Sequence, residues 1–258
     1  MVVISIISLL TSIIIANLSQ VRNKGLVAAG QLFESNVNAK IGDSLIAEYT
    51  FDESSGNIAY DSSGNSQNLT NESASMQRVP GVSGSALEVN DLNDDVSTNN
   101  FNNFPYDEGA LSFWIKPKDT NSTFSQSPLF NAGGSNDSTR RFWVALGMQS
   151  SISNFPGLFN AVNNWMPQFN SGFDASKMFG HWNHVLITWT TSNKVALYVN
   201  GVFISSYTYT PANLNGNKLF APGTGSYGRF NIGGDDDARY TLMDMDRVRL
   251  YSKPYELQ

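Results

Sequence analysis

Two aspartates near the end of the chain, Asp244 and Asp246, stand two residues apart in a segment with the alternation of a strand. Side chains two apart on a strand share one face, so both carboxylates would project together. A carboxylate pair can cleave a glycosidic bond when its groups are about 5–9 Å apart. The flanking positions hold Leu242 and Arg247 and no glutamate. We therefore expect no catalytic set here and no enzymatic activity.

Two histidines, His181 and His184, form an H-x-x-H pattern. On a helix this spacing could begin a metal site. In a strand, residues three apart point to opposite faces. The neighbouring residues alternate as in a strand, so we expect one histidine to point inward and no metal to bind.

The stretch 154–180 mixes aromatic residues with asparagines and lacks the period of a helix or strand. Aromatic rings stack on sugar rings and amides bond to hydroxyls, which suits glycan binding on a loop. The alternative is that most of these aromatics pack in the core. The candidate ligand-binding residues are Trp165, Asn163, Asn164 and Phe169. Trp114 and Trp189 lie in alternating segments instead, and we expect them in the core.

The composition excludes several classes of protein. The chain has 258 residues, a formal net charge of −6 and no cysteine. Without cysteine there is no disulfide framework and no thiolate metal site. No basic stripe occurs, which argues against nucleic acid as a partner. The length suits one large β-sandwich with a short appendage.

From Leu45 onward, apolar and polar residues alternate and turn signals separate the runs at intervals of roughly ten residues. Asn200-Gly201 is the strongest of these signals, since Asn-Gly favours a two-residue hairpin turn. We predict a mainly β fold, an antiparallel sandwich over residues 44–258, preceded by a helical domain over residues 1–43.

Five sequence blocks resemble laminin-G-like jelly-roll domains of the concanavalin A-like superfamily. They are YTFDESSGNIAYDSSGNSQNL, PGVSGSALEVND, LSFWIKP, HWNHVLITW with its following hairpin, and MDRVRLYSKPYEL, and they stand in family order. The resemblance implies a jelly roll that binds a glycan or a surface protein. It also implies a structural calcium ion held by Asp61 and Asp246, with Asp52 as a further ligand. The alternative for Asp61 is a carboxylate that only caps a turn.

The opening segment, Val2 to Leu18, contains no charged residue. As a helix it would rise about 25 Å, slightly less than the hydrocarbon core of a bilayer. The serines at Ser5, Ser8, Ser12 and Ser19 share one helix face. Small residues on one face let helices approach closely, in lipid or in a bundle. The helical period continues to Gly42, which predicts a single helix of about 40 residues.

Three interpretations of this helix compete. A secretory signal peptide would begin with basic residues, whereas the first one here is Arg22. An ordinary membrane anchor is the second. The third is a resemblance: MVVISIISLLTSIIIANLSQVRNKG is similar to the N-terminal helix of type IV pilins and pseudopilins. That family's leader, cleavage-site glycine and glutamate are absent, so we hypothesise that the true start lies upstream of Met1.

These patterns together predict a cell-surface protein, membrane-anchored or filament-associated, that presents its β-domain outside the cytoplasm for adhesion. Its partners would be a glycan or surface protein, and a membrane or filament through the helix. Two alternatives stay open. One is a structural subunit of a homo-oligomeric pilus-like filament, and the other is an exported polysaccharide-active enzyme.

Overall fold

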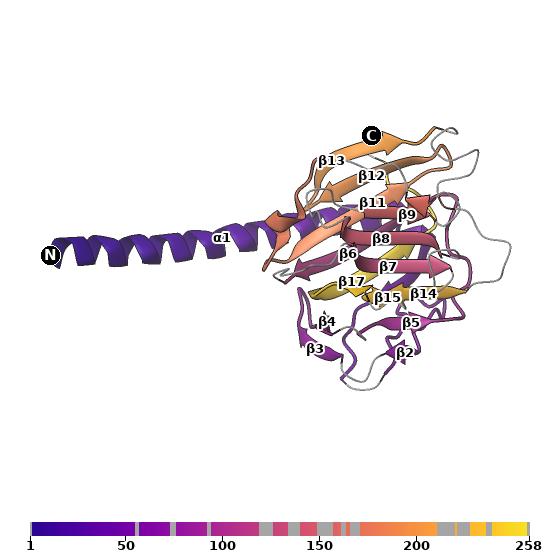
Figure 1. Cartoon of the computed structure of the whole chain (residues 1–258), viewed down its shortest axis with the longest axis horizontal. Coiled ribbons are helices and arrows are strands. Elements are labelled where there is room, and N and C mark those ends of the chain that lie inside the picture. Colours follow the sequence, from indigo (N-terminus) through magenta and orange to yellow (C-terminus); the bar gives the residue numbers. More distant parts are fainter. Residues whose placement is uncertain are drawn as a thin grey trace.

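The computed structural model shows a β-sandwich entered by one long helix (Figure 1). It describes residues 2–54, 57–72, 76–91, 94–118, 126–133, 140–148, 157–160, 164–165, 171–210, 220, 228–235 and 239–256. The predicted class, mainly antiparallel β with a long N-terminal helix, is confirmed.

The helix α1 (Val2–Ile41) has 40 residues, as its period predicts. Its first part projects from the sandwich into solvent (Figure 1). Large apolar side chains on this part are 57–69% exposed, namely Ile4, Ile7, Leu18 and Val21. Among the residues that the structure describes, no helix is long and apolar enough to cross a membrane.

Of the four serines predicted to share a helix face, only Ser8 has a described side chain. It is exposed, and its hydroxyl donates a hydrogen bond to the carbonyl of Ile4, 2.9 Å away. The side chains of Ser5, Ser12 and Ser19 lie outside the described residues, so a small-residue contact face stays a prediction.

Two large sheets form the sandwich. One has eight strands in the order β13-β12-β11-β6-β17-β4-β3, with β1 also paired to β17. Its strands are β1 (Leu45–Tyr49), β3 (Gln77–Pro80), β4 (Ser85–Val89), β6 (Gly109–Pro117), β11 (Asn183–Trp189), β12 (Lys194–Val199), β13 (Val202–Thr208) and β17 (Met243–Tyr251).

The second sheet has seven strands in the order β10-β9-β8-β7-β14-β5-β2. They are β2 (Asn71–Glu72), β5 (Val96–Thr98), β7 (Gln126–Gly133), β8 (Arg140–Met148), β9 (Gly157–Asn160), β10 (Asn164–Trp165) and β14 (Arg229–Ile232). A small sheet joins β15 (Gly234–Asp235) to β16 (Arg239–Tyr240), and short 3-10 turns occupy Gly42–Ser44 and Ala175–Met178.

The main core fills the space between the two large sheets, because every second side chain of a strand points inward. Phe113 on β6, Phe130 on β7 and Trp189 on β11 are buried there. The predicted Asn-Gly hairpin joins β12 to β13, with positive φ of 50° at Asn200 and 81° at Gly201. The prediction that Trp189 belongs to the core is confirmed.

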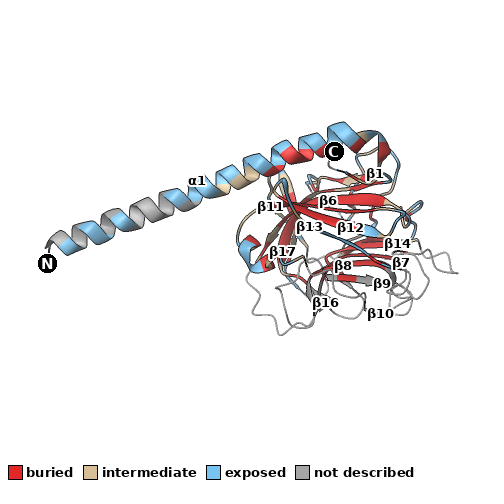
Figure 2. Cartoon of the chain, turned by 90° about the horizontal axis from the view of Figure 1, so that it is seen from above, coloured by how far each residue is buried: buried red, intermediate tan, exposed pale blue. Residues whose placement is uncertain are grey.

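A second core lies on the opposite face of the eight-stranded sheet, beneath the last third of α1. Phe33, Val37 and Ile41 repeat at four-residue steps along one helix face and pack on the sheet. The sheet contributes Ala110, Leu186, Ala196, Tyr198 and Tyr251, with Tyr255 from the C-terminal segment. Figure 2 shows α1 along this layer, on the side away from the seven-stranded sheet.

Gly30 sets how closely α1 approaches the sheet. A Cβ at this position would lie 2.4 Å from the indole ring of Trp114 and 2.9 Å from Cβ of His184. Such a contact is impossible without movement, so only glycine permits this approach. Trp114 is fully buried, as predicted, but under the helix and not between the sheets.

A buried carboxylate fastens the helix. Glu34 Oε2 accepts hydrogen bonds from Trp114 Nε1 at 3.2 Å and Arg247 Nη1 at 3.1 Å. Its other oxygen is paired with Arg249, which also binds Glu48 through Nε at 2.6 Å. A buried charge is tolerated because its partners replace the lost water.

The boundary at residue 43 stays a prediction for the division into domains. The helix does end close to it, at Ile41. However, the segment from Gly30 to Ile41 is part of the sandwich's own packing, since it covers apolar residues and compensates two arginines. The packing of the sandwich thus extends into α1 as far as Gly30, and we predict that its folding unit begins there.

Truncation tests this boundary. A variant that begins at Gly30 should melt within a few degrees of the full chain. A variant that begins at Ser44 leaves Arg247 and Arg249 without Glu34, and loss of one partner of a buried pair costs about 3–5 kcal/mol. Its melting temperature should fall by roughly 10 °C or more. Circular dichroism during heating measures both, and equal melting of the two variants would contradict the assignment.

Two glycines of α1 provide a matched pair. Gly25→Ala should stabilise the helix by up to about 1 kcal/mol, because nothing lies within 4 Å of its added Cβ. Gly30→Ala gains the same propensity but overpacks Trp114, which typically costs about 1–3 kcal/mol. Urea unfolding should give opposite signs for the two variants. Stabilisation by both would show that α1 does not pack tightly on Trp114.

Candidate ligand-binding site

The two faces of the seven-stranded sheet differ in chemistry. Inward positions such as Phe130, Phe142 and Phe230 belong to the core. The alternate positions Asn131 and Asn231 face the other way, because neighbours along a strand point to opposite faces. Both asparagines are nonetheless buried.

Strand register brings these outer residues into one line across the sheet. Asn231 on β14 pairs with Ser97 on one side and Asn131 on the other, and Asn131 in turn pairs with Trp143 on β8. Directly paired residues share a face and lie about 4.5–5.5 Å apart. We call Ser97, Asn231, Asn131 and Trp143 the amide–tryptophan row.

The amides of this row have unused hydrogen-bonding capacity. Asn131 is 1% exposed, and among the described residues neither its Oδ1 nor its Nδ2 has a partner. Asn231 donates from Nδ2 to Asp95 at 2.9 Å, while its Oδ1 has no partner in the described part of the chain. A buried polar group without a hydrogen-bond partner lowers the free energy of unfolding by about 1–3 kcal/mol, so each of these groups requires an explanation.

Charged groups stand at one end of the row. The Asp95 carboxylate that accepts from Asn231 also lies 3.9 Å from Arg229, and its side chain is 31% exposed. This end of the row therefore reaches solvent, and it combines an acceptor and a cation beside the buried amides.

The sequence-predicted ligand residues fall near the other end of the same sheet. Asn164 and Trp165 form β10, its edge strand, so the expectation that Trp165 lies on a loop is wrong. Trp165 pairs with Phe159, and Phe159 pairs with Trp143, which extends the row's register to β10. The side chains of Asn164 and Trp165 lie outside the described residues, as do Asn163 and Phe169 entirely.

Sequence reasoning missed Asn131 and Asn231. A signal was present, since each asparagine interrupts an apolar run, in Leu129-Phe130-Asn131-Ala132 and Phe230-Asn231-Ile232. Alternation marks both as outward positions, but it does not reveal that they are buried, because an outward residue normally meets water.

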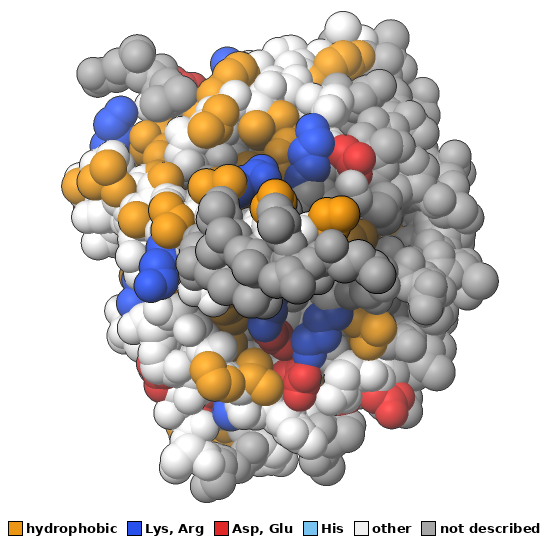
Figure 3. Space-filling model, turned by 90° about the vertical axis from the view of Figure 1, so that its left-hand side faces the viewer, with side chains coloured by type: hydrophobic (Ala, Val, Ile, Leu, Met, Phe, Trp, Pro, Cys, Tyr) orange, Lys and Arg blue, Asp and Glu red, His pale blue; other side chains and the backbone are white. Residues whose placement is uncertain are grey.

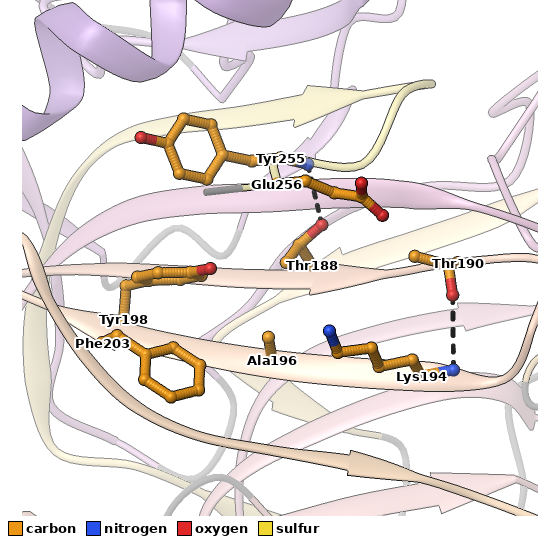
Figure 4. Close-up of a pocket in the computed structure, with 8 residues that line it drawn as sticks. All are labelled: Thr188, Thr190, Lys194, Ala196, Tyr198, Phe203, Tyr255 and Glu256. Atoms are coloured by element: carbon orange, nitrogen blue, oxygen red, sulfur yellow. Dashed lines mark hydrogen bonds between the residues drawn. The ribbon is translucent and has the colours of Figure 1, made fainter. Parts of the chain in front are cut away.

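Two further hollows flank α1 on the other sheet. Figure 3 looks along the projecting helix and shows apolar side chains, with Lys and Arg among them, gathered on the face around it. A groove of about 330 Å³ runs between α1 and the segment before β11, lined by Lys24, Val27, Lys116, His181 and Trp182 among others. A cleft of about 310 Å³ lies over β11, β12 and β13 (Figure 4).

The aspartate pair of β17 is engaged within the chain. Asp244 forms ion pairs with Lys116 at 3.0 Å and Lys118 at 2.8 Å. Asp246 Oδ2 accepts from the backbone amides of Val82 and Ser83, at 2.8 and 3.3 Å. These contacts hold strands and the β3–β4 turn in place, which is a structural role.

The three predicted calcium ligands divide into two places. Asp52 and Asp246 both hold the β3–β4 turn, and Asp52 Oδ1 accepts from Ser85 N at 2.8 Å. Asp61 instead organises its own turn by accepting from the amides of Glu48, Ser63 and Gln67, each at 2.9 Å.

These aspartates therefore do not assemble as one set of ligands. Within the described ranges, no group of three or more His, Cys, Asp or Glu residues is gathered as a metal ion requires. Asp61 has the turn-capping contacts of the alternative interpretation, and calcium binding stays a prediction.

The two histidines differ in burial, but His181 lies outside β11 and both stand on the α1 side of the sheet, so they do not occupy opposite faces of one strand. His184 is buried beneath α1, with Nε2 2.8 Å from Ser112 Oγ and its ring 5.7 Å from that of Phe33. Burial lowers the pKa of His184 to about 3, so its ring is neutral. His181 precedes β11 and lines the groove beside α1.

Asp246 gives a pH dependence with a definite sign. Burial raises the pKa of Asp246 from 3.8 to about 6, against the opposing hydrogen bonds from two amides. The folded chain thus holds this proton more tightly than the unfolded chain. The resulting stability is complete below about pH 4 and is lost as pH rises through about 6. At one pKa unit per 1.36 kcal/mol, the loss is roughly 3 kcal/mol.

We expect the free energy of unfolding of Asp246→Asn, relative to that of the wild type, to be higher at about pH 7 than at about pH 4.5. Urea unfolding at both pH values, with EDTA present, measures this difference. Asp61→Asn is the matched control. Burial alone would raise the pKa of Asp61, but its three amide hydrogen bonds outweigh burial and lower it. The Asp61 carboxylate therefore stabilises the fold above its ordinary pKa, and this stabilisation is lost only in acid. Asp61→Asn should lower the free energy of unfolding at pH 7. A pH-independent difference for Asp246→Asn would refute the assignment.

Comparisons with known proteins agree with this fold. The family model of the Concanavalin A-like lectin/glucanases superfamily matches residues 90–257. A search of curated proteins finds no match. Domain 4 of AbnA, an extracellular arabinanase from Geobacillus stearothermophilus solved with arabinotriose, is 21% identical with a TM-score of 0.58, covering 83% of this chain and 94% of that chain.

Two longer structures are also similar. The botulinum neurotoxin serotype D ligand-binding domain, in complex with N-acetylneuraminic acid, is 16% identical with a TM-score of 0.55 and covers 84% of this chain. The Trypanosoma rangeli sialidase in complex with sialic acid is 15% identical with a TM-score of 0.56 and covers 83% of this chain. This chain spans only 50% and 31% of their respective lengths, and at these identities the likeness is one of fold. Since the family model covers more than half of the sequence, the chain belongs to the Concanavalin A-like lectin/glucanases superfamily.

Proposed function

We propose that this chain presents a glycan-binding sandwich on a long N-terminal helix, and that the glycan binds along the amide–tryptophan row. The observation that carries the proposal is Asn131. Its amide is buried with both polar atoms unpartnered among the described residues. A chain gains nothing in stability from such a group, so it is best explained by a ligand that supplies the missing hydrogen bonds.

Sugar hydroxyls fit this requirement, because each hydroxyl both donates and accepts. Asn131 offers one acceptor and an amide donor, and Asn231 offers a free acceptor beside it. Trp143, next in register and itself 1% exposed, forms the buried aromatic end of the row. Saccharides are also the ligands of similar structures, arabinotriose in one and sialic acid in two.

The proposed role is binding and not turnover. Asp244 pairs with two lysines and Asp246 accepts hydrogen bonds from two backbone amides, so both carboxylates are engaged within the chain. A polysaccharide-active enzyme remains the alternative function. Measured release of reducing sugar ends by the full chain would favour it.

The position of the helix leaves the proposed glycan-binding face accessible. The helix docks on the eight-stranded sheet, so the outer face of the seven-stranded sheet points away from it (Figure 2). The exposed apolar side chains of its first part, Ile4 to Val21, need a partner, since water disfavours such a surface. We propose a membrane or a filament of like helices as that partner, which would place the β-domain at the cell surface.

Asn131→Leu tests the glycan site sharply. Leucine has a similar volume and removes two unpartnered polar atoms, so the melting temperature should stay unchanged or rise. Binding to glycans on an array that carries arabinotriose and sialylated sugars should weaken at least tenfold, or by about 1.4 kcal/mol. A simple structural role for Asn131 predicts the reverse, a lower melting temperature with binding intact.

Asn183→Leu is the matched control on the other sheet. Asn183 is equally buried, but its amide donates to the carbonyls of Met178 and His181 and accepts from Asn200. Its replacement should lower the melting temperature and leave glycan binding at temperatures below melting unchanged. Equal loss of glycan binding in both variants would count against a site on the seven-stranded sheet.

A further inference from the structure

A second binding site is indicated by the cleft of about 310 Å³ on the eight-stranded sheet (Figure 4). It lies on the sandwich face opposite the amide–tryptophan row, next to the docked part of α1. Its lining comes from β11, β12, β13 and the C-terminal segment, namely Thr188, Thr190, Lys194, Ala196, Tyr198, Phe203, Tyr255 and Glu256. The volume is at the lower end for ligand pockets, which suits a small molecule.

The cleft exists because a small side chain forms its floor. Ala196 stands on β12 between Lys194 and Tyr198, which share its face at two-residue spacing. Its cross-strand neighbours are Thr188 and Ser206, which are also small. Ala196 belongs to the second core, so a bulkier residue there would project into the cleft and away from the main core between the two sheets.

One end of the cleft is aromatic. The ring of Tyr198 lies 5.4 Å from Phe203 and 5.7 Å from Tyr255, centroid to centroid. Rings at these distances touch one another, so they leave no gap that could enclose an ammonium group. Phe203 is 47% exposed although it is aromatic. This end therefore suits an apolar group that packs against the rings.

The other end carries two opposite charges. Figure 4 shows the Lys194 amine extending over Ala196 and the Glu256 carboxylate on the opposite wall. Among the residues that the structure describes, neither forms an ion pair. Two unlike charges that face one cleft without meeting can both be satisfied by one ligand that carries both signs.

We propose that this cleft binds a free α-amino acid with an apolar or aromatic side chain. The ligand's carboxylate meets the Lys194 ammonium, its ammonium meets the Glu256 carboxylate, and its side chain packs on Phe203 and Tyr198. The site is independent of the proposed glycan site, because the two lie on different sheets and share no residue.

Saturation-transfer NMR on the full chain tests the proposal with L-phenylalanine and two analogues that each lack one charge, phenethylamine and 3-phenylpropionate. We expect L-phenylalanine to bind with a dissociation constant below about 1 mM and each analogue at least tenfold more weakly. Lys194→Gln should reduce the difference between L-phenylalanine and phenethylamine, and Glu256→Gln the difference between L-phenylalanine and 3-phenylpropionate.

Ala196→Leu should abolish L-phenylalanine binding while the melting temperature stays within a few degrees. Asn131→Leu should leave it unchanged, so failure of the glycan proposal would not affect this one. The proposal is overturned if L-phenylalanine fails to bind at millimolar concentration, if Ala196→Leu binds it normally, or if phenethylamine binds equally well. Displacement of L-phenylalanine by arabinotriose would equally overturn it, by making the cleft a sugar site.

Discussion

The buried carboxylate of Glu34 is the interaction on which the architecture depends. It lies where Trp114, Arg247 and Arg249 converge, and it joins the helix to the two central strands of the eight-stranded sheet. Arg247 reaches it from a bulge with positive φ of 47°, a strained conformation that the ion pair helps to hold. Without the carboxylate, Arg247 would lose its ion pair with Glu34, and Arg249 would keep only its pair with Glu48 among the described residues. Helix and sheet therefore stabilise each other.

The sequence predicts the class of fold well because its signals are local. Alternation, the Asn200-Gly201 turn and the unbroken helical period each depend on a few neighbouring residues. The docking of α1 could not be predicted in this way. Gly30 and Glu34 are ordinary helix-surface residues until the sheet is present, and their partners Trp114 and Arg249 stand far along the chain.

The candidate sites were predictable only in part, for the same reason. Composition drew attention to Trp165, and the register does connect its strand to Trp143. Asn131 and Asn231 escaped notice because their significance is burial without hydrogen bonds, which no sequence pattern expresses. The aspartates show a different limit of the sequence, since a resemblance suggested a shared ion for Asp61 and Asp246 but could not show that each also accepts hydrogen bonds from the amides of a separate turn.

The path of the chain from α1 into β1 has a mechanical consequence. The helix passes through only three residues, Gly42–Ser44, before β1 begins its antiparallel pairing with β17. Tension applied to the projecting end of α1 is met first by the aromatic contacts of Phe33 and by the Glu34 ion pairs. These contacts must shear before any load reaches the hydrogen bonds of β1. The docked third of the helix therefore bears a pulling force first, and it protects the hydrogen bonds of the sandwich from that force.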